Sequence, residues 1–360
     1  MMPGGRLAAL EGLRGYAALL VFLVHAFGVL AVRLYGFDPD QASVWRGGEL
    51  TLPGVVLLLL HRSHYGVDLF FVLSGLLMAD LAATRWPGAV PFLRRRWLRI
   101  YPAYAVSTLA FAAVAVTWLG REPTPGEAIG NAFLLQGFFV LGIHATNPVS
   151  WSLSFEAAFY LALPLLAATL RRNCPPDHTT WAVLAALFAT IVTASALTAV
   201  PGMVYMAYFA LFIPGIAIGL LDARARERLA AALPVAVVLS AWAAFALAVK
   251  LEVLANTGGA YYLASGIAGG LLVLKACDGA SLLARLLSSA PARWLGRYSY
   301  SFFLAHYLVV HLWSRVVMQA VPVESRLAHT AVFLVGALIA SLAAARLLYA
   351  ITERYYFRRP

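Results

Sequence analysis

An arginine and a histidine interrupt the first long apolar run of the chain, RGYAALLVFLVH, where they are Arg14 and His25. Eleven residues of α-helix make about three turns, so both side chains project from nearly the same stripe, roughly 16 Å apart along the axis. Histidine can act as a general base near neutral pH, whereas arginine stays charged. One interpretation of the pair is therefore a general base at His25 within the membrane, with Arg14 at the cytoplasmic end of the same helix. The alternative is structural: an arginine that anchors the helix end and a histidine that bonds a neighbouring helix.

Two carboxylates stand in apolar runs further along the chain. Asp68 opens GVDLFFVLSGLLMAD, at a depth that resembles that of His25 if the two helices are antiparallel neighbours, so it could orient the imidazole. A negative charge in the first turn of a helix is also favourable without any other role. Glu156 lies about two turns into its run, WSLSFEAAFYLALPLL, too deep for a cap, which favours a catalytic role or a buried ion pair. We therefore predict that one of the two carboxylates supports His25, and the sequence leaves open which.

Four arginines precede the start of the third long apolar run, in FLRRRWLRIYPAY. Arg96 and Arg99 are three residues apart and can share one helical face, where two guanidinium groups suit the binding of phosphate. Simple anchoring at a membrane surface explains Arg94 and Arg95. His306 lies near the middle of a later run, LGRYSYSFFLAHYLVV, where a histidine can also serve only to bond across a helix interface.

The composition determines what kind of elements must hold these side chains. Of 360 residues, 62% are hydrophobic and only 12% are charged, and the mean hydropathy is +0.80. A water-soluble fold of this length could not carry so much apolar surface. The net charge of +11 comes from arginines in short runs between apolar stretches, a pattern of membrane topology and not of nucleic-acid binding.

A helix that crosses a bilayer needs roughly 20 mainly apolar residues. Ten runs meet that test, so we predict an all-α membrane fold, a polytopic bundle of about ten transmembrane helices. Two shorter runs, 50–60 and 132–142, are predicted to be interfacial or re-entrant. The predicted spans are 13–32, 66–83, 100–119, 151–170, 181–200, 203–221, 232–250, 260–276, 299–318 and 330–350.

The distribution of positive charge predicts the orientation. With both termini cytoplasmic, the inner segments hold 18 Lys and Arg residues and the outer segments hold 7, which favours an even number of spans. We therefore expect a multi-pass protein of the cytoplasmic (inner) cell membrane. The first apolar run has no cleavage site after it, so we expect it to be retained. Cys174 and Cys277 fall in or beside inner segments, where we expect no structural disulfide.

Five segments, in this order along the chain, resemble blocks of the acyltransferase 3 family of membrane acyltransferases. They are LEGLRGYAALLVFLVHAF, GVDLFFVLSGLLMA, RRRWLRIYPAY, WSLSFEAAFYLALP and GRYSYSFFLAHYLVV. They extend over most of the chain, so we predict a single integral membrane acyltransferase domain, 1–360. ITERYYF resembles the family's terminal Glu-x-Pro pattern in part, with Tyr355 at the proline position. Since the chain ends at Pro360, we expect a stand-alone enzyme without the esterase-like domain that some relatives carry.

The resemblance implies transfer of an acyl group, commonly acetyl, from cytoplasmic acyl-CoA to a hydroxyl of a carbohydrate, glycolipid or other small acceptor. His25 matches the family's catalytic histidine, here a predicted general base, and Arg14 matches its partner. Arg96 and Arg99 match the functional arginine pair, and the remaining candidates match recurrent positions. We accordingly predict that the catalytic residues are His25, Arg14, Asp68 and Glu156, and that the donor-binding residues are Arg96, Arg99 and His306.

The expected partners follow from this reaction. They are acyl-CoA as the donor substrate, the hydroxyl acceptor and membrane lipid, with no nucleic acid, no permanently bound cofactor and no metal. The rival function from another class is a secondary transporter or flippase, in which intramembrane His, Asp and Glu residues form a proton relay. The sequence has no repeated halves, and a transporter does not need the basic face before the third run, so acyl transfer is favoured.

Overall fold

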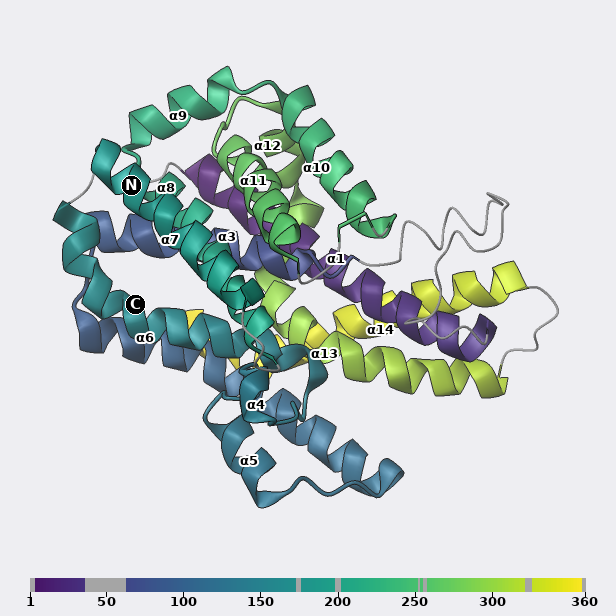
Figure 1. Cartoon of the computed structure of the whole chain (residues 1–360). Helices are drawn as coiled ribbons and strands as arrows, with labels where there is room; N and C mark the ends of the chain where they lie inside the picture. Colours follow the sequence, from purple (N-terminus) through teal and green to yellow (C-terminus); the bar gives the residue numbers. More distant parts are fainter. Residues whose placement is uncertain are drawn as a thin grey trace.

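The computed structural model describes residues 4–35, 63–172, 176–197, 202–251, 253–254, 258–320 and 326–357. Within these ranges every regular element is a helix, which confirms the all-α prediction (Figure 1). The longer helices are α1 (Gly4–Tyr35), α3 (Gly66–Thr84), α4 (Ala89–Leu119), α6 (Trp151–Arg172), α7 (His178–Leu197), α10 (Val235–Lys250), α11 (Gly259–Ala276), α13 (Ala290–Ala320) and α14 (Arg326–Ile351). The shorter ones are α5 (Pro125–Ala132), η1 (Phe139–Leu141), η2 (Pro148–Ser150), η3 (Met203–Leu211), α8 (Phe212–Leu220), α9 (Ala223–Ala232), α12 (Leu282–Leu287) and α15 (Glu353–Phe357).

The ten predicted spans fall largely on helices. The exceptions are Leu221, Leu233 and Pro234, which are not helical, and residues 198–200, which lie outside the described residues. In the described part of the chain, eight helices are long and apolar enough to cross a membrane. The number rises to nine if α9 and α10, which meet at 80°, form one span. Helix α13 carries the ninth predicted range and is 31 residues long, but it is not among these eight. The count of ten and the cytoplasmic side of the termini therefore stay predictions.

The connection between α4 and α6 folds back against the bundle. The shorter run 132–142 contains only the end of α5 and the three residues of η1, so it does not span, whereas 50–60 lies outside the described residues. The Tyr104 hydroxyl of α4 donates to the Asn131 carbonyl at 2.7 Å. The Asn147 amide donates to the Leu304 carbonyl of α13 at 3.0 Å. Side-chain bonds to backbone carbonyls thus hold this connection against both α4 and α13.

Helices α1 and α13 pack with their backbones in contact, and α14 lies alongside them (Figure 1). Gly296 of α13 makes this possible, because a Cβ built at that position would lie 1.9 Å from the Glu11 carbonyl oxygen of α1. Any larger residue would push the helices apart. The close crossing sets the register in which the side chains further along α1 and α13 meet.

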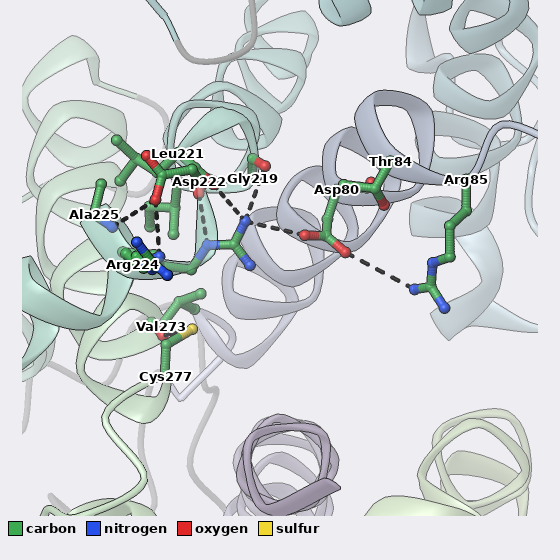
Figure 2. Close-up of polar contacts among 12 residues, drawn as sticks. Asp80, Thr84, Arg85, Gly219, Leu221, Asp222, Arg224, Ala225, Val273 and Cys277 are labelled. Carbon is green, nitrogen blue, oxygen red and sulfur yellow. Dashed lines mark hydrogen bonds and ion pairs between the residues drawn. The ribbon is translucent and has the colours of Figure 1, made fainter. Parts of the chain in front are cut away.

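Figure 2 shows Asp80 of α3 near Gly219 and Leu221 at the end of α8, and a buried arginine of α9 bonds to all three. The Arg226 guanidinium donates to Asp80 of α3 at 3.0 Å and to the carbonyls of Gly219 and Leu221 at 3.0 and 2.8 Å. Its Nε donates to the Ile218 carbonyl at 3.1 Å. The last carbonyls of a helix have no partner within that helix, so Arg226 satisfies α8 while Asp80 balances its charge.

Candidate active site

The predicted base, His25, lies against a second histidine. Its Nδ1 is 3.0 Å from Nε2 of His306, and the other ring nitrogen of His306, Nδ1, is 3.1 Å from the Phe302 carbonyl oxygen. His306 is completely buried, and the two imidazole rings lie 5.1 Å apart between centroids. We expected His306 among the donor-binding residues, but its contact is with His25, because the α1–α13 crossing brings the two side chains to one level.

Asp68 does not bond His25. Its Oδ2 accepts hydrogen bonds from the Tyr261 hydroxyl and the Ser265 hydroxyl of α11, each at 2.6 Å. Successive residues of a helix point about 100° apart, so Asp68 faces α11 while Phe70, two positions on, faces α13. The expectation that Asp68 orients the imidazole of His25 is therefore not met by these contacts.

Glu156 is also bonded elsewhere. Its carboxylate accepts from the Ser74 hydroxyl of α3 at 3.1 Å and makes a short hydrogen bond with the Tyr160 hydroxyl, one turn along α6. Its charge lies within electrostatic reach of Arg14. Glu156 is thus partly buried, with two hydroxyls bonded to it and an arginine nearby, and the choice between a catalytic role and a buried ion pair stays a prediction.

Four of the predicted residues line one small cavity of about 60 Å³, called here the inner cavity. They come from three helices, α1, α4 and α6, and they place three positive charges and one carboxylate around a narrow space. The four are Arg14, Arg96, Arg99 and Glu156, and the lining also includes Tyr160, Tyr300, Phe70 and Phe303.

A larger cavity of about 650 Å³, called here the vestibule, adjoins the inner cavity. Both are lined by Arg14, Leu77, Arg99 and Tyr300, so these side chains stand at their boundary. Leu7 of α1 and Glu353 of α15 line the vestibule together, so the two ends of the described chain lie on one side of the bundle. The charged residues that belong to the vestibule alone are Glu11, Arg293, Arg297 and Glu353.

Sequence reasoning selected none of these four vestibule residues as functional. Arg293 and Arg297 were counted only as topology charges, and only the partial Glu-x-Pro resemblance pointed to Glu353. Burial raises the pKa of the Glu353 carboxyl, and the hydrogen bond from the Ser301 hydroxyl and the charge of Arg99 oppose that rise. This buried acid beside arginines marks the vestibule as an electrostatically organised site.

An aromatic pair lines the inner cavity, and one of its rings also lies beside the histidine pair. The rings of Phe70 and Phe303 lie 5.8 Å apart, and both line the inner cavity. The Phe303 ring also lies 6.1 Å from that of His306. A group that extends from the vestibule through the inner cavity would therefore reach the histidine pair past these two rings.

The described residues contain no group of three or more His, Cys, Asp or Glu side chains arranged to hold a metal ion. Cys277 is a free, buried cysteine whose Sγ contacts the Val273 carbonyl, and Cys174 lies outside the described residues.

Comparison with known proteins identifies the chemistry. The family described as an acyltransferase domain matches residues 7–348. The chain belongs to the acyltransferase 3 family. It is 27% identical to Acyltransferase MdmB of Streptomyces mycarofaciens, over 86% of this chain and 81% of that protein. It is also 27% identical to a putative peptidoglycan O-acetyltransferase, YrhL, of Bacillus subtilis, over 80% of this chain and 48% of that protein.

A further relative is the peptidoglycan O-acetyltransferase OatA of Listeria monocytogenes, 24% identical over 69% of this chain and 45% of that protein. The match thus spans about half the length of the two peptidoglycan enzymes. No solved structure matches the chain. Family membership makes the protein a membrane-bound O-acyltransferase, and the transporter alternative is set aside.

Proposed function

We propose that the protein transfers an acyl group, in the first place acetyl, from cytoplasmic acyl-CoA to a hydroxyl of a carbohydrate, glycolipid or other small acceptor. The observation that carries the proposal is the shared boundary of the two cavities. Arg14 and Arg99 line both the vestibule and the inner cavity, and Phe303, which also lines the inner cavity, has its ring 6.1 Å from that of His306. One route of this kind suits a long donor with a phosphate-rich end and a reactive thioester end.

The vestibule is the proposed site for the nucleotide end of the donor. Guanidinium groups bind phosphates through paired hydrogen bonds, and Arg99, Arg293 and Arg297 all line this space. The pantetheine arm would then pass Arg14 and Tyr300 into the inner cavity. Eleven residues of α1, about 16 Å along its axis, separate Arg14 from His25, a length that an extended arm can cover.

His25 is the proposed general base. It would take the proton of the acceptor hydroxyl as that oxygen attacks the thioester carbonyl carbon. The carbon–sulfur bond then breaks, and the thiolate of CoA takes the proton back from the imidazolium, which restores neutral His25 and gives free CoA and an ester. General base catalysis of this kind contributes typically about 10²–10⁴-fold to the rate.

Two relatives are named peptidoglycan O-acetyltransferases, which supports a carbohydrate acceptor and an acetyl donor for this chain too. The more fully covered relative is named only as an acyltransferase, so a small-molecule acceptor is the second candidate. The folded-back connection between α4 and α6, which bonds Leu304 two residues from His306, is the proposed wall of the acceptor site.

The test is release of free CoA thiol from acetyl-CoA by the full chain in detergent or nanodiscs, with and without carbohydrate acceptors. His25→Ala should fold and lose acyl transfer by about 10²-fold or more, and the exposed His178→Ala is the matched control with unchanged rate. Full activity of His25→Ala would refute the assignment of the base.

The donor site has a separate test. The double variant Arg293→Ala with Arg297→Ala should raise the KM for acetyl-CoA by at least about 10-fold with a small change in kcat, because it removes two phosphate partners. Arg171→Ala with Arg172→Ala, two exposed arginines at the end of α6, is the charge-matched control. An unchanged KM would exclude the vestibule as the nucleotide site.

A further inference from the structure

The two histidines form a directed chain that ends on a backbone carbonyl. We propose that His306 is a positioning residue that holds His25 in the tautomer with hydrogen on Nδ1, so that Nε2 of His25 is the basic nitrogen of the reaction. The inference rests on the proposed function of His25 as general base. It assigns a role to His306 and identifies the atom of His25 that must face the acceptor hydroxyl.

The argument begins at Phe302. A backbone carbonyl oxygen only accepts hydrogen bonds, and it lies 3.1 Å from Nδ1 of His306, so this nitrogen must carry the hydrogen. A neutral imidazole has one N–H, so Nε2 of His306 holds a lone pair. That lone pair lies 3.0 Å from Nδ1 of His25, which must therefore be the donor. Nε2 of His25 is left as an acceptor.

The reverse arrangement would need a charge on His306. If Nδ1 of His25 accepted, Nε2 of His306 would have to donate while its Nδ1 also donates to Phe302, which describes an imidazolium. His306 has no exposed surface. The contacts of His306 among the described residues are with His25, the Phe302 carbonyl and aromatic rings, and the Asp68 and Glu156 carboxylates accept hydrogen bonds from hydroxyl groups elsewhere. A buried cation without a counterion is strongly disfavoured, so the neutral chain is the stable one.

The packing around His306 keeps it in position. The Phe302 ring stacks on its imidazole at 5.9 Å and 25°, and the Phe22 ring of α1 meets it edge-on at 6.3 Å. The Tyr307 ring meets that of His25 edge-on at 5.0 Å. A side chain locked by aromatic neighbours and by a backbone carbonyl has the rigidity that a positioning residue requires.

The hydrogen bond from His25 to His306 also stabilises the imidazolium form of His25 that arises during the reaction. When Nε2 of His25 takes the proton of the acceptor hydroxyl, Nδ1–H still donates to the lone pair of His306, and this bond strengthens because its donor is now charged. No proton needs to move along the chain. His306 thus plays the part that a carboxylate plays in many histidine sites, without a second charge in the membrane interior.

The experiment combines nitrogen NMR of ¹⁵N-histidine-labelled full-length protein with steady-state kinetics. The His25 resonances, assigned by their loss in His25→Gln, should show a protonated Nδ1 and an unprotonated Nε2. His306→Gln keeps an acceptor oxygen and should retain this tautomer and most of kcat. His306→Leu has no acceptor, so it should show mixed tautomers and a kcat lowered by on the order of 10²-fold, with an unchanged KM for acetyl-CoA.

His329→Gln is the control, because His329 is a buried histidine of α14 that is not part of the hydrogen-bonded His25–His306 pair. This variant should leave the His25 spectrum and kcat unchanged. A wild-type His25 with hydrogen on Nε2 would overturn the proposal, as would full kcat in folded His306→Leu. If His306→Leu does not fold, the wild-type spectrum and the His306→Gln variant decide. Activity that persists in His25→Ala would instead refute the proposed function, whichever tautomer the spectrum shows.

Discussion

The crossing of α1 and α13 offers a sharp test of how the fold positions the histidine pair. In Gly296→Ala the added Cβ would lie 1.9 Å from the Glu11 carbonyl oxygen, whereas ordinary van der Waals contact begins at 3.4 Å. The atoms that collide belong to a helix backbone, so rotation of a side chain cannot relieve the overlap. The two helices must therefore separate by about 1.5 Å at this point.

That separation is enough to break the contact between the histidines. Their nitrogens are 3.0 Å apart, and a hydrogen bond weakens beyond about 3.2 Å. His25 lies 14 residues from Glu11, about 21 Å along α1, so the helices could pivot and pass on only part of the displacement. Even half of it would leave the nitrogens too far apart. A misplacement of this size typically costs about 10²-fold in rate, and we expect that loss in kcat.

The assay is acetyl-CoA turnover by purified Gly296→Ala, with folding checked by circular dichroism and gel filtration. Gly28→Ala is the matched control, since Gly28 lies on α1 one turn from His25 and a Cβ there would meet nothing within 4 Å. The control should keep full kcat and gain roughly 0.5–1 kcal/mol of stability from higher helix propensity. Wild-type kcat in folded Gly296→Ala would refute the idea that this close crossing positions the histidines.

Three further predictions concern stability. Arg226→Ala removes the hydrogen-bond donor of the buried Asp80 carboxylate and of the carbonyls at the end of α8, so it should lower the free energy of unfolding by about 3–5 kcal/mol and lower the Tm. The exposed Arg224→Ala is the control and should leave the Tm unchanged. Asp68→Asn weakens the hydrogen bonds to Tyr261 and Ser265 of α11, so it should lower the free energy of unfolding by about 1–3 kcal/mol and leave kcat unchanged. A loss of kcat at unchanged Tm would instead indicate that this carboxylate has a catalytic role. Burial raises the pKa of the Glu353 carboxyl in the folded chain above its value of 4.5 in the unfolded chain. The protonated carboxyl therefore stabilises the fold fully below pH 4.5, and this stabilisation is lost as the pH rises through the pKa of the folded chain. Glu353→Gln should therefore gain in Tm over the wild type across that pH window, and thermal scans that stay parallel at every pH would contradict the assignment.

Much of the fold could be predicted from the sequence because its signals are local. A run of about 20 apolar residues must form a helix in a bilayer, where every backbone group needs a partner within its own segment, and the ten predicted runs fall on helices accordingly. The ordered blocks around Arg14, His25 and the Arg96–Arg99 pair were enough to indicate the family, which the comparison confirmed.

The contacts of the site depended on tertiary structure. His25 and His306 are 281 residues apart in the chain, and no periodicity within either helix indicates that their nitrogens meet. Asp68 was a reasonable partner for His25 by depth, but depth is only one coordinate, and the rotation of α3 about its axis turned this side chain toward α11. In the same way the vestibule joins Glu11, Arg293 and Glu353 from three helices.

The sequence by itself therefore determined which segments are helices, which family they form and which residue types are available for acyl transfer. Helix formation and hydropathy are properties of neighbouring residues, so one chain is sufficient to read them. Only the tertiary structure decided which side chains face each other, because that depends on how closely two backbones approach and how each helix is rotated. For the histidine pair, the close approach of the two backbones occurs at Gly296, where α13 contacts α1.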